Sequence, residues 1–219
     1  MRLPVSPRFP GTVEVSAVTR RFGDVTALRG VSFDLPGGTV AALVGPNGSG
    51  KTTLLRILAG LLAAGSGRVL VAGDVPGRGR ASFVPAGDRG LYWRLTGIQN
   101  LEFFARISGL PRPRALEQAR AVSAVLGADD LLARPVGILS TGQRRRLAIA
   151  RGFAAGAGVV LLDEPYADLD EEGAGVVEAL TRAWSSGGGS VLYAAPVLEG
   201  GPPAGIRLDL EEGSLRRRE

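Results

Sequence analysis

The sequence predicts an α/β fold in which a largely parallel sheet carries extra antiparallel strands. Three observations indicate this class. An apolar run at residues 40–44 leads through a glycine-rich loop at 45–53 into a helix-compatible stretch. A second apolar run, at 159–162, ends in two carboxylates and is typical of a strand buried on both faces. Residues 91–155 show mostly helical periodicity, and strands that alternate with helices favour a parallel sheet.

The chain begins with an irregular stretch that leads into two predicted strands. Three prolines lie within residues 1–11, after which Val13 and Val15 alternate with polar residues. Residues 31–35 form the second predicted strand, and Pro-Gly-Gly at 36–38 ends it in a turn.

The middle of the chain is predicted to become helical. We expect a helix from residue 52 to about 62, followed by strands at 68–71 and 81–84. The helical periodicity then runs from about residue 91 to 155 without a flexible linker on either side. This block is therefore expected to be a subdomain inserted between strands of the core.

The last third of the chain returns to alternating strands and helices. Strands are expected at 159–162 and 190–193, with a helix near 172–184 between them. Residues 206–210 and 214–216 resemble a closing hairpin.

The whole chain is predicted to be one domain. Its 219 residues fit one large domain or one domain with a subdomain. We place the α/β core at about 12–90 and 156–219, and the helical subdomain at about 91–155, within a single domain over 1–219.

The composition excludes several kinds of site and partner. The chain has no cysteine and no histidine, so it has no disulfide, thiolate or imidazole metal ligand, or histidine base. The net charge of +5 favours an anionic partner. Apart from the arginine runs at 144–146 and 216–218 the charges are scattered, which indicates a solvated basic surface. The aromatic residues are too few to form a stacking platform for the bases of a single-stranded nucleic acid. We therefore expect no nucleic-acid partner.

Residues 45–53 read Gly-Pro-Asn-Gly-Ser-Gly-Lys-Thr-Thr and match the phosphate-binding pattern G-x-x-x-x-G-K-[ST] in its strand, loop and helix context. The glycines let backbone N–H groups converge on phosphate oxygens, and the helix N-terminus adds partial positive charge. Lys51 would reach the β- and γ-phosphates, and the Thr52 hydroxyl would ligate Mg²⁺. A glycine-rich turn that matches by chance is the alternative. The residues expected to bind the nucleotide here are Gly45, Asn47, Gly48, Ser49, Gly50, Lys51, Thr52 and Thr53.

Lys51 is the only lysine among 26 basic residues, and all the others are arginine. Arginine is a wide planar fork and lysine a compact point charge, so the two are not interchangeable inside a tight phosphate site. The composition therefore singles out Lys51 as a functional residue.

Two carboxylates follow the apolar strand at 159–162. Ligands in open α/β sheets bind at the carboxyl ends of strands, so Asp163 is expected beside the loop and would hold Mg²⁺. Glu164 would polarise the attacking water or accept its proton. A strand that ends in a solvated acidic turn is the alternative.

A third candidate lies at residues 139–143, Leu-Ser-Thr-Gly-Gln, which open the helical run at 144–153. Ser140 is an N-cap candidate, and a helix N-terminus is an anion site. A plain helix cap is the alternative. Phe22 also leaves two interpretations open: a stacking surface for an adenine ring, or the anchor of an edge strand.

In this order, the phosphate-binding loop, Leu-Ser-Thr-Gly-Gln, Leu-Leu-Asp-Glu-Pro at 161–165 and Ala-Asp-Leu-Asp at 167–170 resemble the ATP-binding cassette (ABC) ATPases. The resemblance covers residues 13–215. It implies a P-loop NTPase fold with a RecA-like, mostly parallel core, an antiparallel β subdomain and an inserted helical subdomain. The third signature residue departs from the family, which has glycine where this chain has Thr141.

The resemblance also implies a composite site. Two such domains pack head to tail, so that each ATP lies between one phosphate-binding loop and the other chain's signature. ATP and Mg²⁺ are the implied ligands, and Phe22 falls where the family places its adenine-stacking aromatic. The implied contacts are the signature residues Ser140, Thr141, Gly142 and Gln143 with the partner's γ-phosphate, and Asp168 and Asp170 with the partner domain.

Two residues of the family pattern are missing. The family has a glutamine after the strand that ends here at Val84, whereas this stretch reads Pro-Ala-Gly-Asp-Arg at 85–89. Asp88 can replace it as a ligand of the metal shell, and an irregular loop acid is the alternative. The family histidine after the last core strand is replaced by Ala195-Pro196. Since a positioning or acid–base residue is often worth about 10²–10⁴ in rate, ATP binding is expected to be retained more securely than fast hydrolysis.

The expected function is that of the ATP-binding and hydrolysing subunit of an ABC transporter. The implied partners are an integral membrane subunit and a second cassette, either a copy of this chain or a paralogue. No apolar run approaches the ~20 residues of a membrane span, and the first residues lack the hydrophobic core of a signal peptide. We therefore expect the chain at the cytoplasmic face of the membrane. The alternatives are a soluble ABC-type ATPase and a regulatory module that hydrolyses ATP slowly or not at all.

Overall fold

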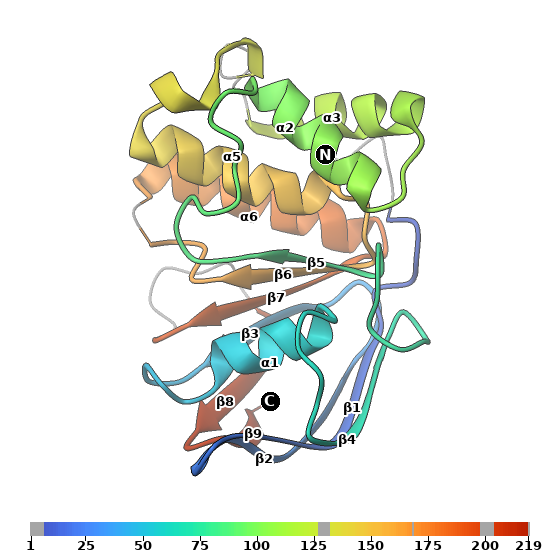
Figure 1. Ribbon diagram of the computed structural model, residues 1–219, viewed down its shortest axis with the longest axis vertical. Coiled ribbons are helices and arrows are strands. Elements are labelled where there is room, and N and C mark those ends of the chain that lie inside the picture. The colour runs from blue at the N-terminus through green and yellow to red at the C-terminus, as the bar shows by residue number, and fades with distance from the viewer. Residues whose placement is uncertain (1–6, 127–131, 168, 198–203, 219) are drawn as a thin grey trace.

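The computed structural model describes residues 7–126, 132–167, 169–197 and 204–218. Within them it has a six-stranded sheet and a three-stranded sheet (Figure 1). The strands are β1 Val13–Phe22, β2 Val25–Leu35, β3 Val40–Val44, β4 Ser66–Val71, β5 Ala81–Val84, β6 Val159–Asp163, β7 Ser190–Ala195, β8 Ile206–Glu211 and β9 Ser214–Arg218. The helices are α1 Lys51–Leu58, α2 Gly97–Ile107, α3 Arg112–Leu126, α5 Thr141–Ala154 and α6 Glu171–Ser186, with a 3-10 turn at Val136–Ile138.

The larger sheet has the strand order β5-β6-β7-β3-β8-β9. All its pairings are parallel except that of β8 with β9. The smaller sheet, β2-β1-β4, is antiparallel. The predicted largely parallel core with extra antiparallel strands is thus confirmed, and so is the closing hairpin.

Helices cover both faces of the larger sheet. In Figure 1, α5 and α6 lie on one face, and α1 lies between the other face and the small sheet. Alternation along β6 explains this, because Val160 and Leu162 pack with residues of α5 and α6, while Val159 and Leu161 pack with α1 and the small sheet. A strand buried on both sides needs an apolar residue at every position, which is why the run at 159–162 is continuous.

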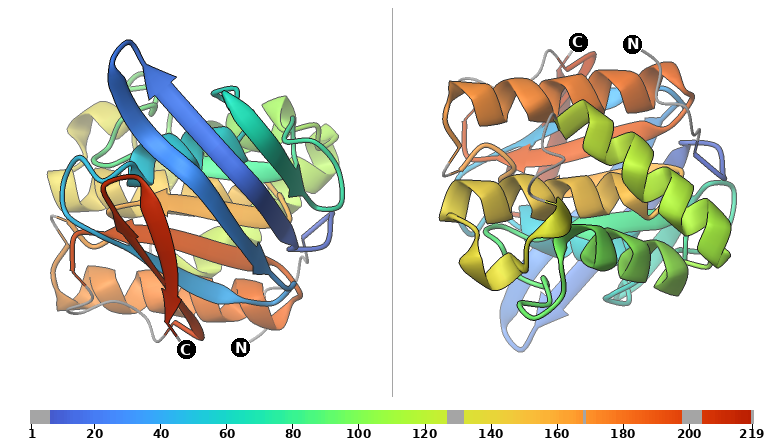
Figure 2. Two further views of the ribbon diagram at one scale, coloured as in Figure 1. Left: turned by 90° about the horizontal axis from the view of Figure 1, so that it is seen from below. Right: turned by 90° about the horizontal axis from the view of Figure 1, so that it is seen from above.

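Helices α2 and α3 of the helical block lie on the same side of the sheet as α5, as both views in Figure 2 show. Helix α2 packs against α3 and α5, and α5 also contacts β5 and β6. Helix α5 therefore joins the helical block to the core. Because α5 packs on β6, the N-terminal residues of α5 are fixed in position relative to the end of β6.

Helix α1 ends earlier than the sequence predicts. We expected it to reach about residue 62, but it stops at Leu58. The physical cause is Gly60, whose φ of +71° lies in the left-handed region that ends helices.

Candidate functional site

The loop between β3 and α1 lies at the carboxyl edge of the parallel strands. Its backbone needs glycine at two points. A Cβ on Gly45 would lie 2.0 Å from the Leu210 carbonyl oxygen, and a Cβ on Gly50 would lie 2.4 Å from that of Ala27. Gly50 has a φ of +106° and is the N-cap of α1 without a side-chain cap. The first N–H groups of α1 are therefore available to an anion.

Lys51 is folded over this loop. Its Nζ donates hydrogen bonds to the Gly45 oxygen at 2.6 Å and to the Pro46 oxygen at 2.9 Å. The residue is only 5% exposed. Burial lowers the pKa of its ammonium below 10.5, while Glu164 and Asp163 act in the opposite direction. The ammonium is thus bound to the loop, and its charge interacts with the two carboxylates at the end of β6.

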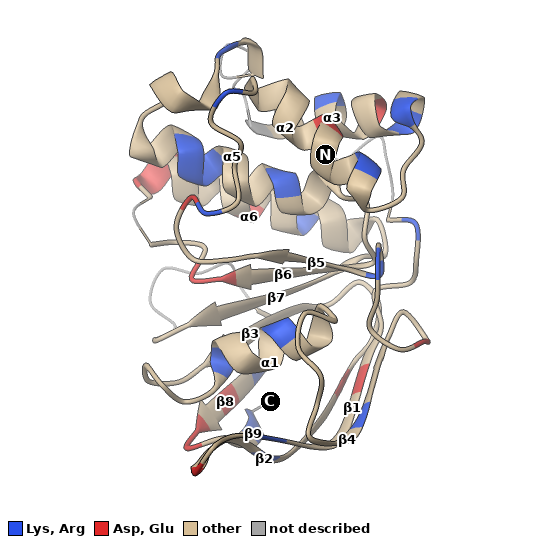
Figure 3. Ribbon diagram, in the orientation of Figure 1, with Lys and Arg blue, Asp and Glu red and all other residues tan. Residues whose placement is uncertain are grey.

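Thr52 and Asp163 meet directly. The Thr52 Oγ1 donates to Asp163 Oδ2 at 2.8 Å, although the residues are 111 positions apart. Figure 3 shows the acidic tip of β6 on the same side of the molecule as the basic start of α1. A hydroxyl beside a carboxylate is a hard oxygen pair of the kind that Mg²⁺ prefers. Among the described residues, no group of three or more His, Cys, Asp or Glu is arranged to hold a metal ion.

Glu164 has a backbone conformation that is rare for its residue type. Its φ is +48°, in the left-handed region, which costs about 1–3 kcal/mol for a non-glycine residue and persists only where the surrounding structure holds it. The Glu164 N–H donates to the Ala194 oxygen of β7 at 3.0 Å. The residue lies just past the end of β6, where the chain leaves the sheet.

The start of α5 carries the predicted signature residues. Ser140 is the N-cap, as expected: its Oγ accepts from the Gln143 N–H at 3.2 Å, and its own N–H donates to Gln143 Oε1 at 2.9 Å. The Thr141 Oγ1 accepts from Arg144. No atom lies within 4 Å of the position a Cβ on Gly142 would take, so that side of the helix start is open. Helices α1 and α5 cover opposite faces of the sheet, so the predicted signature and the loop of one chain begin helices on different faces.

The remaining predicted residues have varied surroundings. Phe22 ends β1 and is 46% exposed, with the Arg20 guanidinium 4.7 Å from its ring centroid. It pairs across the strands with Val25, which lines a cavity of about 350 Å³ together with Gly48, Gly50, Thr52 and Thr53. The Asp170 Oδ1 accepts from the Gly173 N–H as the N-cap of α6. Asp168 lies outside the described residues.

Asp88 is not hydrogen-bonded to Thr52 or Asp163. Its Oδ2 accepts from Arg144 Nε at 2.6 Å, in an ion pair that is partly buried. The Asp88 carboxylate therefore pairs with the start of α5 in the structure. Its role as a metal ligand stays a prediction.

Arg145 is a residue that the sequence reasoning missed. The run at 144–146 was an exception among the scattered charges and had no predicted role, and Arg145 within it is only 1% exposed. Its guanidinium donates to backbone carbonyls on both sides of the site. Helical spacing was the available signal, since Ala148, Ile149 and Gly152 on the same face of α5 are all buried.

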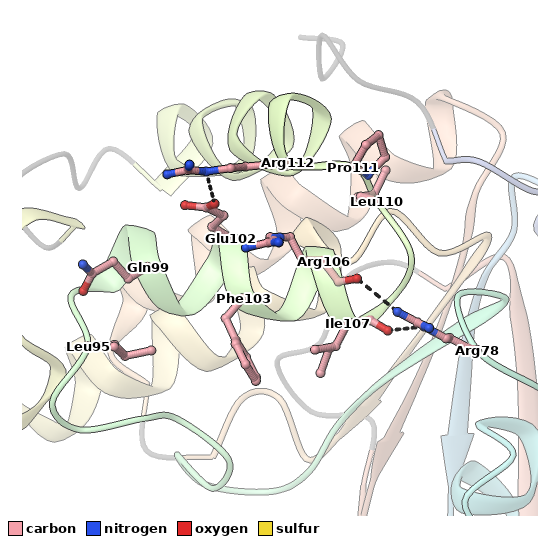
Figure 4. Close-up of a pocket in the computed structure, with 10 residues that line it drawn as sticks. All are labelled: Arg78, Leu95, Gln99, Glu102, Phe103, Arg106, Ile107, Leu110, Pro111 and Arg112. Atoms are coloured by element: carbon pink, nitrogen blue, oxygen red, sulfur yellow. Dashed lines mark hydrogen bonds and ion pairs between the residues drawn. The ribbon is translucent and has the colours of Figure 1, made fainter.

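A second cavity, of about 570 Å³, lies against α2 (Figure 4). Leu95, Phe103, Ile107 and Leu110 supply its apolar wall, and Arg78 donates to the Arg106 oxygen at 3.3 Å along one edge. None of the predicted site residues lines this cavity. It is therefore separate from the loop at 45–53.

No helix in the part of the chain that the structure describes has both the length and the apolar character of a membrane span.

Comparison with known proteins gives consistent results. A family model described as ABC transporter matches residues 28–167. The chain is 38% identical over 181 residues to the cytochrome c biogenesis ATP-binding export protein of Xanthomonas campestris, covering 81% of this chain and 83% of that one. It is 39% identical over 192 residues to a daunorubicin resistance ATP-binding protein of Streptomyces coeruleorubidus, covering 85% and 60%.

Other relatives are longer than this chain. The Fe(3+) ions import ATP-binding protein of Brucella suis is 37% identical over 165 residues, which cover 74% of this chain and 47% of the relative. The chain thus spans about half the length of several of the curated relatives it matches. Among solved structures, an ATP-binding cassette dimer bound to ADP and Pi has a TM-score of 0.81 at 22% identity, covering 94% of this chain and 98% of that one. That likeness supports the fold.

Proposed function

The chain belongs to the ABC transporter family of ATP-binding domains, and from that premise we propose that it is the ATP-binding and hydrolysing subunit of a transporter. The observation that carries this proposal is the direct contact of Thr52 with Asp163 beside Lys51, at the start of a helix without a side-chain cap. These groups form a site for a triphosphate with its metal.

Each residue has a distinct role in the proposed reaction. The N–H groups of the loop and Lys51 bind the phosphates, and Thr52 and Asp163 would hold Mg²⁺, which would supply positive charge to offset that of the phosphates. Glu164 orients the attacking water and takes up its proton. Phe22 is exposed beside the cavity next to the loop, where an adenine ring can stack on it.

The proposed site is completed by a second cassette, either a copy of this chain or a paralogue. Two observations support this: the signature lies across the sheet from the loop of the same chain, and Gly142 is open to the outside. In a head-to-tail pair, the start of α5 would meet the partner's γ-phosphate through its N–H groups. An integral membrane subunit would then convert closing and opening of the pair into transport, with the cassettes at the cytoplasmic face.

Turnover of ATP by the purified chain tests the enzymatic part of the proposal. We expect Mg²⁺-dependent release of phosphate that Lys51→Ala lowers by at least about 100-fold, because the phosphates lose their point charge. Binding of ATP without turnover above the Lys51→Ala variant would favour the regulatory module instead. A soluble ABC-type ATPase is the better description if no multi-spanning membrane protein is encoded next to this chain.

Proton uptake on nucleotide binding is a second expected result. Burial holds the pKa of Lys51 below 10.5 in the free chain, and triphosphate oxygens would raise it by stabilising the ammonium. At alkaline pH, below 10.5, part of the Lys51 population is neutral before binding and charged after it, so binding takes up protons. The uptake falls to zero as the pH is lowered and Lys51 is already charged. Calorimetric titration in two buffers of different ionisation enthalpy measures it, and Lys51→Ala should abolish it.

A further inference from the structure

Arg145 connects two segments that border the proposed site. Its Nη1 donates to the Pro85 oxygen at 2.9 Å and also to the Gly87 oxygen. Its Nη2 donates to the Asp163 oxygen at 3.1 Å and to the Glu164 oxygen at 2.7 Å. One side chain thus hydrogen-bonds the loop after β5 and the end of β6. A planar fork can serve both segments at once, which a lysine ammonium on a flexible stem does not reproduce.

The hydrogen bond from Arg145 to Glu164 is made to a residue whose backbone conformation is strained. Glu164 has a left-handed backbone, with its N–H bound to the Ala194 oxygen. Arg145 binds its carbonyl oxygen. The residue is therefore held at both its N–H and its C=O, and the direction of its side chain follows from that backbone.

The same loop after β5 is held at a second point. Arg144, one residue earlier on α5, donates from Nε to Asp88 and from Nη1 to the Leu139 oxygen, both at 2.6 Å. Its guanidinium also lies 5.0 Å from the ring centroid of Trp93. The start of α5, the loop at 85–88 and the peptide of Glu164 are thus one hydrogen-bonded unit.

We propose that Arg145 is a positioning residue that sets the orientation of Glu164 by binding the carbonyl groups of Asp163, Glu164, Pro85 and Gly87. This rests on the proposed function, in which Glu164 is the catalytic carboxylate. A shift of the start of α5, such as contact with a partner's nucleotide would cause, is transmitted through Arg145 to Glu164. The loop at 85–88 has no glutamine, and Arg145 supplies its connection to the end of β6.

Steady-state kinetics of Arg145→Lys and Arg145→Gln in the full chain test this role. We expect kcat for ATP to fall by about 10²-fold with KM changed by less than about 3-fold, because a misplaced carboxylate loses transition-state stabilisation while the phosphates still bind. In the background of Glu164→Gln, Arg145→Lys should cause no further loss, since both changes remove the same contribution.

Arg151→Lys is the matched control. Arg151 is another buried arginine of α5, 6% exposed, and it donates to the carbonyls of Arg89 and Gly90. Its replacement should lower the unfolding temperature about as much as Arg145→Lys and leave kcat within about 2-fold. Amide hydrogen exchange should speed up around Glu164 in Arg145→Lys and not in Arg151→Lys.

Equal losses of kcat in the Arg145 and Arg151 variants, a raised KM at unchanged kcat, or additivity with Glu164→Gln would overturn the inference. If the Glu164→Gln variant turns over ATP at the wild-type rate, the proposed function is contradicted. If Glu164→Gln is slow but both Arg145 variants have a normal kcat, only the role of Arg145 is contradicted. If the Arg145 variants do not fold, Arg144→Gln tests the same hydrogen-bonded unit, because Arg144 is partly exposed and binds the loop at 85–88 through Asp88. We then expect kcat to fall about 3–10-fold at constant KM, and an unchanged kcat counts against the inference.

Discussion

Replacement of Glu164 by glutamine is expected to lower ATP turnover by about 10²–10⁴-fold, the usual contribution of a positioned acid or base. The amide keeps the size of the side chain and cannot accept the proton of the attacking water. ATP binding should remain within a few-fold of the wild type, since Lys51, Thr52 and Asp163 are untouched. Phosphate release under saturating ATP and Mg²⁺, together with a nucleotide titration, measures both quantities.

Glu117→Gln is the control for this change. Glu117 is an exposed acid of α3 that pairs only with Arg114 among the ion pairs of the described residues, so its loss should leave turnover unchanged. If Glu164→Gln hydrolyses ATP at the wild-type rate, Glu164 is not the catalytic carboxylate, and another group beside Asp163 must activate the water.

Replacement of Gly50 by alanine is expected to abolish nucleotide binding in the micromolar to millimolar range and to destabilise the fold by about 2–4 kcal/mol. Two effects add. The left-handed backbone at φ +106° is strained for any residue with a Cβ, and that Cβ would lie 2.4 Å from the Ala27 oxygen. Relief of the contact must move either β2 or the loop whose N–H groups bind phosphate. Urea unfolding and an ATP titration report the two consequences separately.

Gly175→Ala provides the comparison. Gly175 lies inside α6, and no atom lies within 4 Å of the position its Cβ would take. Alanine there should stabilise the helix by about 0.5–1 kcal/mol without affecting ATP binding. A Gly50→Ala variant that binds ATP like the wild type would show that the loop does not need this backbone conformation.

Much of the site was predictable because strand ends in a parallel sheet share one edge. That rule brought Asp163 to Thr52, and the structure has them 2.8 Å apart. The capping role of Ser140 was also predicted, from a serine directly before a helical run, whereas its reciprocal hydrogen bonds with Gln143 were not. Both predictions depend on local pattern plus one rule of topology.

The parts that were not predicted depend on where single side chains point. The run at 144–146 had no predicted role, and in the structure Arg145 donates to four backbone carbonyls while Arg146 pairs with Glu172 of α6. The ion pair of Asp88 with Arg144 was not predicted either, and the role of Asp88 as a metal ligand stays a prediction. The end of α1 at Leu58 followed from the conformation of Gly60, whereas apolar periodicity alone continued the helix to about residue 62.

The central claim is that ATP is bound between the loop of one chain and the signature of another. Light scattering of the Glu164→Gln chain tests it most directly, because it measures the mass of the chain in solution with and without ATP and Mg²⁺. The variant should be a monomer without nucleotide and a dimer with it. Gly142→Asp added to this background should fold normally, because its side chain enters open space at a helix N-terminus, and should remain a monomer because the carboxylate repels the partner's γ-phosphate. A chain that binds ATP as a monomer at every concentration would contradict a composite site made by two copies of this chain. A dimer that forms equally well with Gly142→Asp would contradict the placement of the signature on the partner's nucleotide.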